Sequence, residues 1–134
     1  MPFAPIPDIL EELKAGKPVV LVDDEDRENE GDIVYAAEAT TPEAVNFMVK
    51  HARGVVCLAL TGETCDRLML RAQTDINTAQ LGTAFTVTID AHQKFGVTTG
   101  VSAKDRAMTI QVAIAEDAQP QDLLRPGHIN PLRW

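Results

Sequence analysis

The chain of 134 residues is 45% hydrophobic and 24% charged, a composition typical of one globular domain rather than of a disordered chain. Its formal net charge of −8 disfavours nucleic acid and anionic membranes as partners, because both attract a positive protein surface. The sequence has no apolar run of the roughly 18–20 residues that a membrane span needs and no basic start followed by an apolar stretch, so we expect a cytoplasmic protein.

A short helix and two strands are expected at the start of the chain. Asp8 can cap the helix, whose apolar positions share one face, and Gly16 suits its C-terminal end. Residues 18–22 are a β-branched run with no polar face, which predicts a buried strand, and residues 33–37 predict another.

The middle of the chain alternates between helix and strand signals. Thr40 or Thr41, followed by Pro42, is a start signal for a helix, and Gly54 ends it. Residues 55–60 then read as a third strand. A turn follows, and the next apolar positions predict a short helix over residues 63–70.

The second half of the chain begins with a segment whose apolar residues follow neither a helical nor a strand period. Residues 71–82 are therefore expected to form a loop, whereas residues 85–89 alternate in the manner of a half-buried strand. Ser102, with Asp105 three residues later, resembles a capping box and should open a further helix.

The order of these elements indicates the fold class. Strands and helices alternate irregularly, and the strands at 18–22 and 33–37 are too closely joined for a crossover helix. We therefore predict an α+β fold in which helices sandwich a mixed β-sheet, with residues 1–134 forming a single domain.

An acidic segment, DDEDRENEGD at residues 23–32, separates the first two strands and places seven carboxylates in ten residues. Such crowding is costly unless cations, donors or water intervene, so the segment is either a solvated acidic loop or a site for a hard cation. An EF-hand is excluded because its last position falls on Ala37 rather than on a glutamate. Within the segment, Arg27 either neutralises its neighbours or binds a substrate phosphate or carbonyl.

Other candidate residues are isolated. The two cysteines give no disulfide framework or metal-ligand spacing, and Cys57, inside an apolar run, is a buried thiol or a reactive one. Residues 98–102 offer hydroxyls and backbone donors to a phosphate, or simply cap the helix that follows.

His128, expected in a turn after Pro-Gly, is a candidate acid or base. His51 and His92 have no companions and are expected at the surface.

Five segments together resemble the 3,4-dihydroxy-2-butanone 4-phosphate synthase family in order and spacing, and they span nearly the whole chain. They are DDEDRENEGD at 23–32, GVVC at 54–57, FTVT at 85–88, TTGVSAKDR at 98–106 and RPGH at 125–128. The first is highly specific, since ten fixed positions seldom arise by chance.

This resemblance implies a homodimer of α+β subunits that converts ribulose 5-phosphate to 3,4-dihydroxy-2-butanone 4-phosphate and formate with Mg²⁺ or Mn²⁺. It implies a catalytic set and a substrate-binding set, with Glu28 as the metal ligand. The catalytic set is Glu30, Asp32, Cys57 and His128, and the substrate-binding set is Arg27, Glu28, Asp32 and Thr99.

The chain ends at Trp134, soon after the RPGH segment. The resemblance implies that later family segments supply a second metal ligand, a histidine, and further substrate contacts. We therefore expect an incomplete domain that binds Mg²⁺ weakly, since one carboxylate leaves most of the water shell in place. Alternative roles are a non-catalytic sugar-phosphate-binding or assembly module and a generic acidic cation binder.

Overall fold

The computed structural model describes residues 3–134. Its α-helices are α1 Ile6–Lys14, α2 Pro42–His51, α3 Gly62–Arg67 and α4 Ala103–Ile114. Its strands are β1 Val19–Val22, β2 Gly31–Val34, β3 Cys57–Leu60, β4 Ile89–Ala91 and β5 Leu123–Arg133. Short 3-10 helices are η1 Ala37–Ala39, η2 Gln93–Phe95 and η3 Pro120–Asp122. No helix in this part of the chain is long and apolar enough to cross a membrane.

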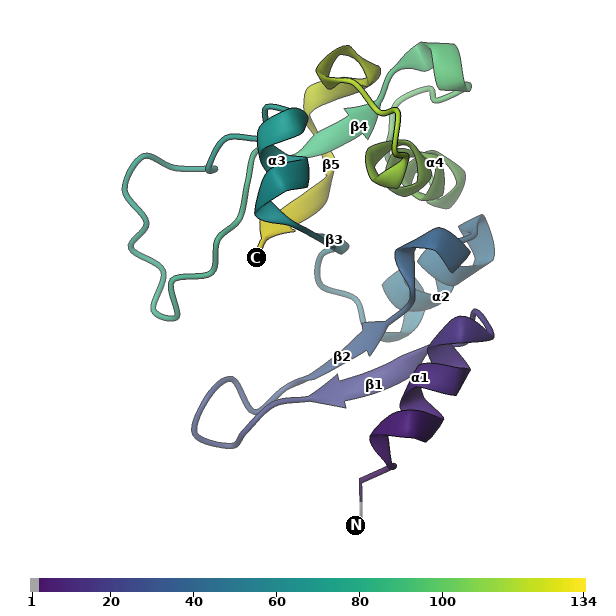
Figure 1. Ribbon diagram of the computed structural model, residues 1–134, viewed down its shortest axis with the longest axis vertical. Coiled ribbons are helices and arrows are strands. Elements are labelled where there is room, and N and C mark those ends of the chain that lie inside the picture. The colour runs from purple at the N-terminus through teal and green to yellow at the C-terminus, as the bar shows by residue number, and fades with distance from the viewer. Residues whose placement is uncertain (1–2) are drawn as a thin grey trace.

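The central sheet is mixed, as predicted. Strand β5 lies in the middle, parallel to β3 and antiparallel to β4. Helix α4 packs against β4 and β5, and α2 packs against α4 (Figure 1). The core between these elements is built from aliphatic side chains that include Val45, Leu68, Ile89 and Ile129, each fully buried. The α+β fold class is therefore confirmed.

The first two strands form a separate antiparallel hairpin, β1–β2, rather than part of the central sheet. The prediction that residues 18–22 are buried is wrong: Val20 is 65% exposed, Leu21 64% and Val22 46%. An apolar run predicts a strand but not what covers it. Strand β2 begins at Gly31 and ends at Val34, because the chain then turns into η1.

Two helix starts are set by local side-chain chemistry, as predicted. The Thr41 hydroxyl accepts a hydrogen bond from Ala44 N at 3.1 Å, and the Ser102 hydroxyl accepts one from Asp105 N at 3.0 Å. The expected helix α1 forms, and Gly16 follows its end with a positive φ, but the expected N-cap is wrong, since Pro5 is the N-cap and Asp8 lies inside the first turn. There its charge still favours the positive end of the helix dipole.

Two other boundaries differ from the predictions. Helix α3 begins at Gly62 and ends at Arg67, because Thr61 caps it by accepting from Thr64 N at 3.1 Å. Residues 85–89 are largely irregular, with isolated bridges at Phe85 and Thr86, and the regular strand β4 starts only at Ile89. The segment 71–82 is an exposed loop, as expected.

Candidate functional site

Asp23 organises the acidic loop between β1 and β2. Its carboxylate accepts hydrogen bonds from Glu28 N and Glu30 N, both at 2.9 Å, and from Arg27 Nη1 at 2.7 Å. The bond from the Glu30 backbone is the largest cause that lowers the pKa of Asp23, and the Glu28 backbone and Arg27 act in the same direction. A charged Asp23 therefore holds the loop in one conformation.

Arg27 neutralises its acidic neighbours, one of the two roles that its sequence context suggested. It pairs with Asp23 and with Glu28, whose Oε2 lies 3.2 Å from Arg27 Nη1, and its side chain remains 52% exposed. With Glu28 and Glu30 it lines an open cavity of about 420 Å³, which is also lined by Ala79, Gln80, Leu81 and Thr83. The loop thus presents one cation and two carboxylates to the same space.

Asp32 and Cys57 meet at a second cavity, of about 520 Å³, which Tyr35 and Leu132 also line. The interpretation of Cys57 as a buried thiol is wrong, since the residue is exposed, while Cys65 is buried; both are free. Loss of hydration at the sulfur raises the pKa of the Cys57 thiol, and the negative charge of Asp32 raises it further. Cys57 is therefore a hydrogen-bonding thiol rather than a thiolate at neutral pH.

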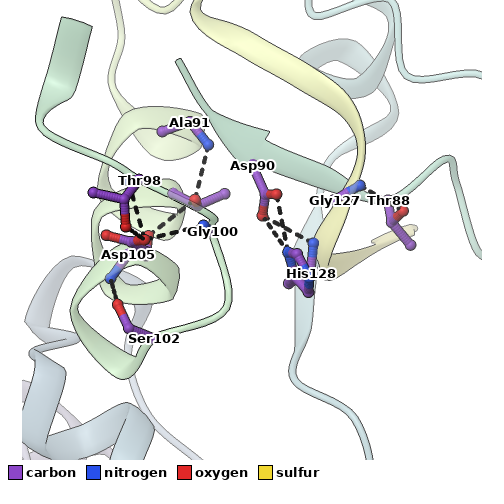
Figure 2. Close-up of polar contacts among 10 residues, drawn as sticks. Thr88, Asp90, Ala91, Thr98, Gly100, Ser102, Asp105, Gly127 and His128 are labelled. Atoms are coloured by element: carbon purple, nitrogen blue, oxygen red, sulfur yellow. Dashed lines mark hydrogen bonds and ion pairs between the residues drawn. The ribbon is translucent and has the colours of Figure 1, made fainter. Parts of the chain in front are cut away.

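His128 lies on β5 rather than in a free turn, and it contacts an aspartate that the sequence analysis missed. Its ring Nδ1 is 2.9 Å from Oδ2 of Asp90, and its backbone N–H donates to Oδ1 at 2.9 Å (Figure 2). The His128 side chain is 42% exposed and that of Asp90 11%. The sequence carried one signal that could have found Asp90: it is a lone charged residue in the stretch Thr-Ile-Asp-Ala at residues 88–91, at the end of a strand that was expected to be half-buried.

The loop that carries Thr99 is fixed by Asp105. One Asp105 oxygen accepts from Thr98 N, the Thr98 hydroxyl and Gly100 N, at 3.0–3.1 Å (Figure 2). Burial disfavours the charged form of Asp105, but these donors outweigh it and lower the pKa of the carboxyl. Asp105 therefore does not complete a reciprocal capping box with Ser102; it anchors the backbone on both sides of the exposed Thr99.

Gly100, the neighbour of Thr99 in sequence, lies against Asp90, the partner of His128. A Cβ on Gly100 would overlap the Asp90 carboxylate, so the loop that carries Thr99 passes directly over the partner of His128. The remaining histidines lie elsewhere: His51 is exposed on α2 and stacks on Phe47, and His92, half-buried rather than at the surface, caps η2 through Lys94 N.

The predicted site residues thus form three groups. Arg27, Glu28 and Glu30 share one cavity, and Asp32 and Cys57 share another. The loop that carries Thr99 packs through Gly100 against Asp90, the partner of His128. Among residues 3–134 the structure gathers no three His, Cys, Asp or Glu side chains around one cation position. The exposed oxygens of Glu28 and Glu30 nevertheless suit a hard cation such as Mg²⁺, which prefers carboxylate ligands and retained waters.

Known proteins resemble this chain over nearly its whole length. A family model described as 3,4-dihydroxy-2-butanone 4-phosphate synthase matches residues 7–134. A Neisseria meningitidis serogroup B protein with that name is 57% identical over 98% of this chain and 36% of its own length. The riboflavin biosynthesis protein RibBA of Aquifex aeolicus is 55% identical over 98% of this chain and 32% of its own length.

Solved structures agree with the sequence comparisons. A 3,4-dihydroxy-2-butanone 4-phosphate synthase in complex with two magnesium ions superposes with a TM-score of 0.95 at 45% identity, over 98% of this chain and 61% of that one. A cation-free form superposes with a TM-score of 0.89 at 44% identity, over 99% and 60%. The chain therefore spans about a third of the length of these curated relatives and about three-fifths of these solved chains.

Proposed function

The chain belongs to the 3,4-dihydroxy-2-butanone 4-phosphate synthase family, and we propose that it takes part in the conversion of D-ribulose 5-phosphate to 3,4-dihydroxy-2-butanone 4-phosphate and formate. This lyase reaction would serve riboflavin biosynthesis in the cytoplasm. The observation that carries the proposal is the acidic loop, in which Asp23 holds Arg27, Glu28 and Glu30 toward one open cavity.

The proposed chemistry is enolisation of the sugar phosphate, loss of a hydroxyl, a skeletal rearrangement and release of one carbon as formate. Arg27 would bind a phosphate or carbonyl oxygen through its planar fork. Asp32 and Glu30 would move protons next to the reacting oxygens, and His128 would act as acid or base. Thr99 would contact substrate, and the protonated Cys57 thiol would donate a weak hydrogen bond near Asp32.

Glu28 would hold the divalent cation, Mg²⁺ or Mn²⁺, which when bound polarises the substrate's carbonyl and hydroxyl oxygens. In the structure Glu28 is paired with Arg27, so a cation must compete with that guanidinium. The resemblance implies that in the family a histidine from a later segment also binds the metal. Turnover is therefore best measured in an extended polypeptide, in which residues 1–134 are followed by the C-terminal part of the Neisseria meningitidis relative.

Metal binding provides the first test. We expect Mg²⁺ to bind the 134-residue chain weakly, and several-fold more tightly with ribulose 5-phosphate present, because substrate oxygens complete the coordination shell. Glu28→Gln should abolish this binding. Glu25→Gln, which removes an equal charge from the same loop, should leave it nearly unchanged. Titration calorimetry with and without ribulose 5-phosphate measures both effects. Equal losses of Mg²⁺ affinity in the two variants would instead indicate that the acidic loop attracts cations through its overall charge, without a specific site.

The exposed apolar side chains of β1 support a proposed homodimer. Val20, Leu21 and Val22 are consecutive and all exposed, an arrangement that monomers seldom leave open to water. We expect light scattering at micromolar concentration to give a mass near twice 14.6 kDa. Leu21→Glu should shift the chain toward monomer, whereas Ile76→Glu, at an exposed position in the loop 71–82, should not. A monomeric parent chain would contradict the proposal.

A further inference from the structure

We propose that Asp90 is a positioning residue for His128: it holds the imidazole with Nδ1 protonated, so that Nε2 is left free to accept a proton. The catalytic consequence rests on the proposed function, but the state of the imidazole does not. Asp90 is not among the residues to which the family resemblance assigns a role.

The first step is the contact with the ring. Asp90 Oδ2 lies 2.9 Å from His128 Nδ1, and Asp90 Oδ1 lies 3.2 Å from the same nitrogen. An ionised carboxylate only accepts hydrogen bonds, and a neutral imidazole carries one N–H. The ring must therefore donate from Nδ1, and its lone pair is on Nε2. Because the side chain of His128 is 42% exposed, Nε2 remains accessible to a substrate.

The second step is the rigidity of the carboxylate. In the pairing of β4 with β5, Ile89 faces Ile129 but Asp90 faces Leu124, so residues 125–128 form a bulge between the two pairs. Asp90 fills this bulge and accepts the His128 N–H at 2.9 Å. Asp90 is only 8% exposed. Its position is therefore determined by the strand, not by a flexible loop.

Two glycines, Gly127 and Gly100, let the backbone approach β4 closely at Asp90. A Cβ on Gly127 would overlap the backbone of Ile89, and a Cβ on Gly100 would overlap the Asp90 carboxylate. Gly127 N also donates to the Thr88 hydroxyl at 2.9 Å (Figure 2). The chain thus packs against Asp90 from two sides, which leaves the carboxylate little freedom except to face His128.

The geometry also predicts the effect of Asp90→Asn. The His128 backbone N–H can only donate, so the amide oxygen must occupy the Oδ1 position. The amide NH₂ then takes the Oδ2 position and donates to Nδ1 of the ring. This reverses the imidazole: Nδ1 becomes the acceptor and Nε2 carries the proton. A nearly isosteric change should therefore remove the proton-accepting nitrogen without removing the histidine.

Nitrogen-15 NMR of the 134-residue chain tests the assignment directly. Spectra are recorded near pH 8, above the usual imidazole pKa of about 6.5, and His128→Gln identifies the His128 signals. We expect the Nδ1–H form in the parent chain and the Nε2–H form in Asp90→Asn. Asp122→Asn removes a comparably buried carboxylate, paired with Lys94, and should leave the parent pattern intact. A parent chain with Nε2–H would overturn the proposal even if Asp90→Asn did not fold.

Turnover in the extended polypeptide tests the catalytic consequence. Asp90→Asn should lower kcat by roughly 10²-fold, the lower end of the range that a positioned acid or base contributes, with KM for ribulose 5-phosphate nearly unchanged. If Asp90 acts only through His128, adding Asp90→Asn to His128→Ala should cause no further loss. Fully additive losses would show a separate role and contradict the positioning proposal. An inactive parent polypeptide with the expected NMR pattern would count against the proposed function alone.

Discussion

Replacing His128 with alanine in the extended polypeptide should lower formate release from ribulose 5-phosphate by roughly 10²–10⁴-fold, the range that a positioned acid or base contributes. The physical reason is that each step moves a proton next to oxygen. His128 offers an exposed ring nitrogen whose opposite side is fixed by Asp90. Coupled detection of formate in saturating Mg²⁺ measures the effect.

The matched control for this experiment is His51→Ala. His51 is exposed on α2, where it stacks only on Phe47, so its loss should leave turnover within about twofold of the parent, as for a surface substitution. Circular dichroism melting of both variants checks that His128→Ala has not simply unfolded β5. Near-parental turnover by a folded His128→Ala protein would remove His128 from the catalytic set.

The parts of this fold that could be predicted from sequence are those governed by local chemistry. Thr41 and Ser102 start helices because a hydroxyl and the N–H three residues later lie within one turn of chain. The acidic loop was predicted for the same reason, since ten consecutive residues carry the signal. The role of Asp23 in ordering this loop was not predicted, because Asp23 accepts several hydrogen bonds only after the hairpin has formed.

The rest depends on contacts between distant residues. Strand β5 pairs with β3 and β4, which lie far earlier in the chain, and no local pattern specifies that pairing. The Asp90–His128 contact spans 38 residues and depends on a bulge in the pairing register. The exposure of Leu21 also depends on distant residues, since the sequence of its strand would be the same whether or not another element covered it.

Asp32→Asn should have the second largest effect, a loss of formate release of roughly 10²–10⁴-fold in the extended polypeptide. An amide cannot accept a proton as a carboxylate does, while its shape is nearly the same. Asp26→Asn, an equal change in charge at an exposed position of the same acidic loop, should leave turnover close to that of the parent.

The same substitution should change Cys57 in a way that does not depend on catalysis. The charge of Asp32 helps to raise the pKa of the Cys57 thiol, so its removal should lower that pKa and increase the thiolate fraction at a fixed pH. Alkylation of Cys57 by iodoacetamide should then be faster in Asp32→Asn than in Asp26→Asn, while the fully buried Cys65 stays unreactive. Faster alkylation with unchanged turnover would place Asp32 beside Cys57 but outside the catalytic set. Unchanged alkylation would contradict the effect of the Asp32 charge on the Cys57 thiol.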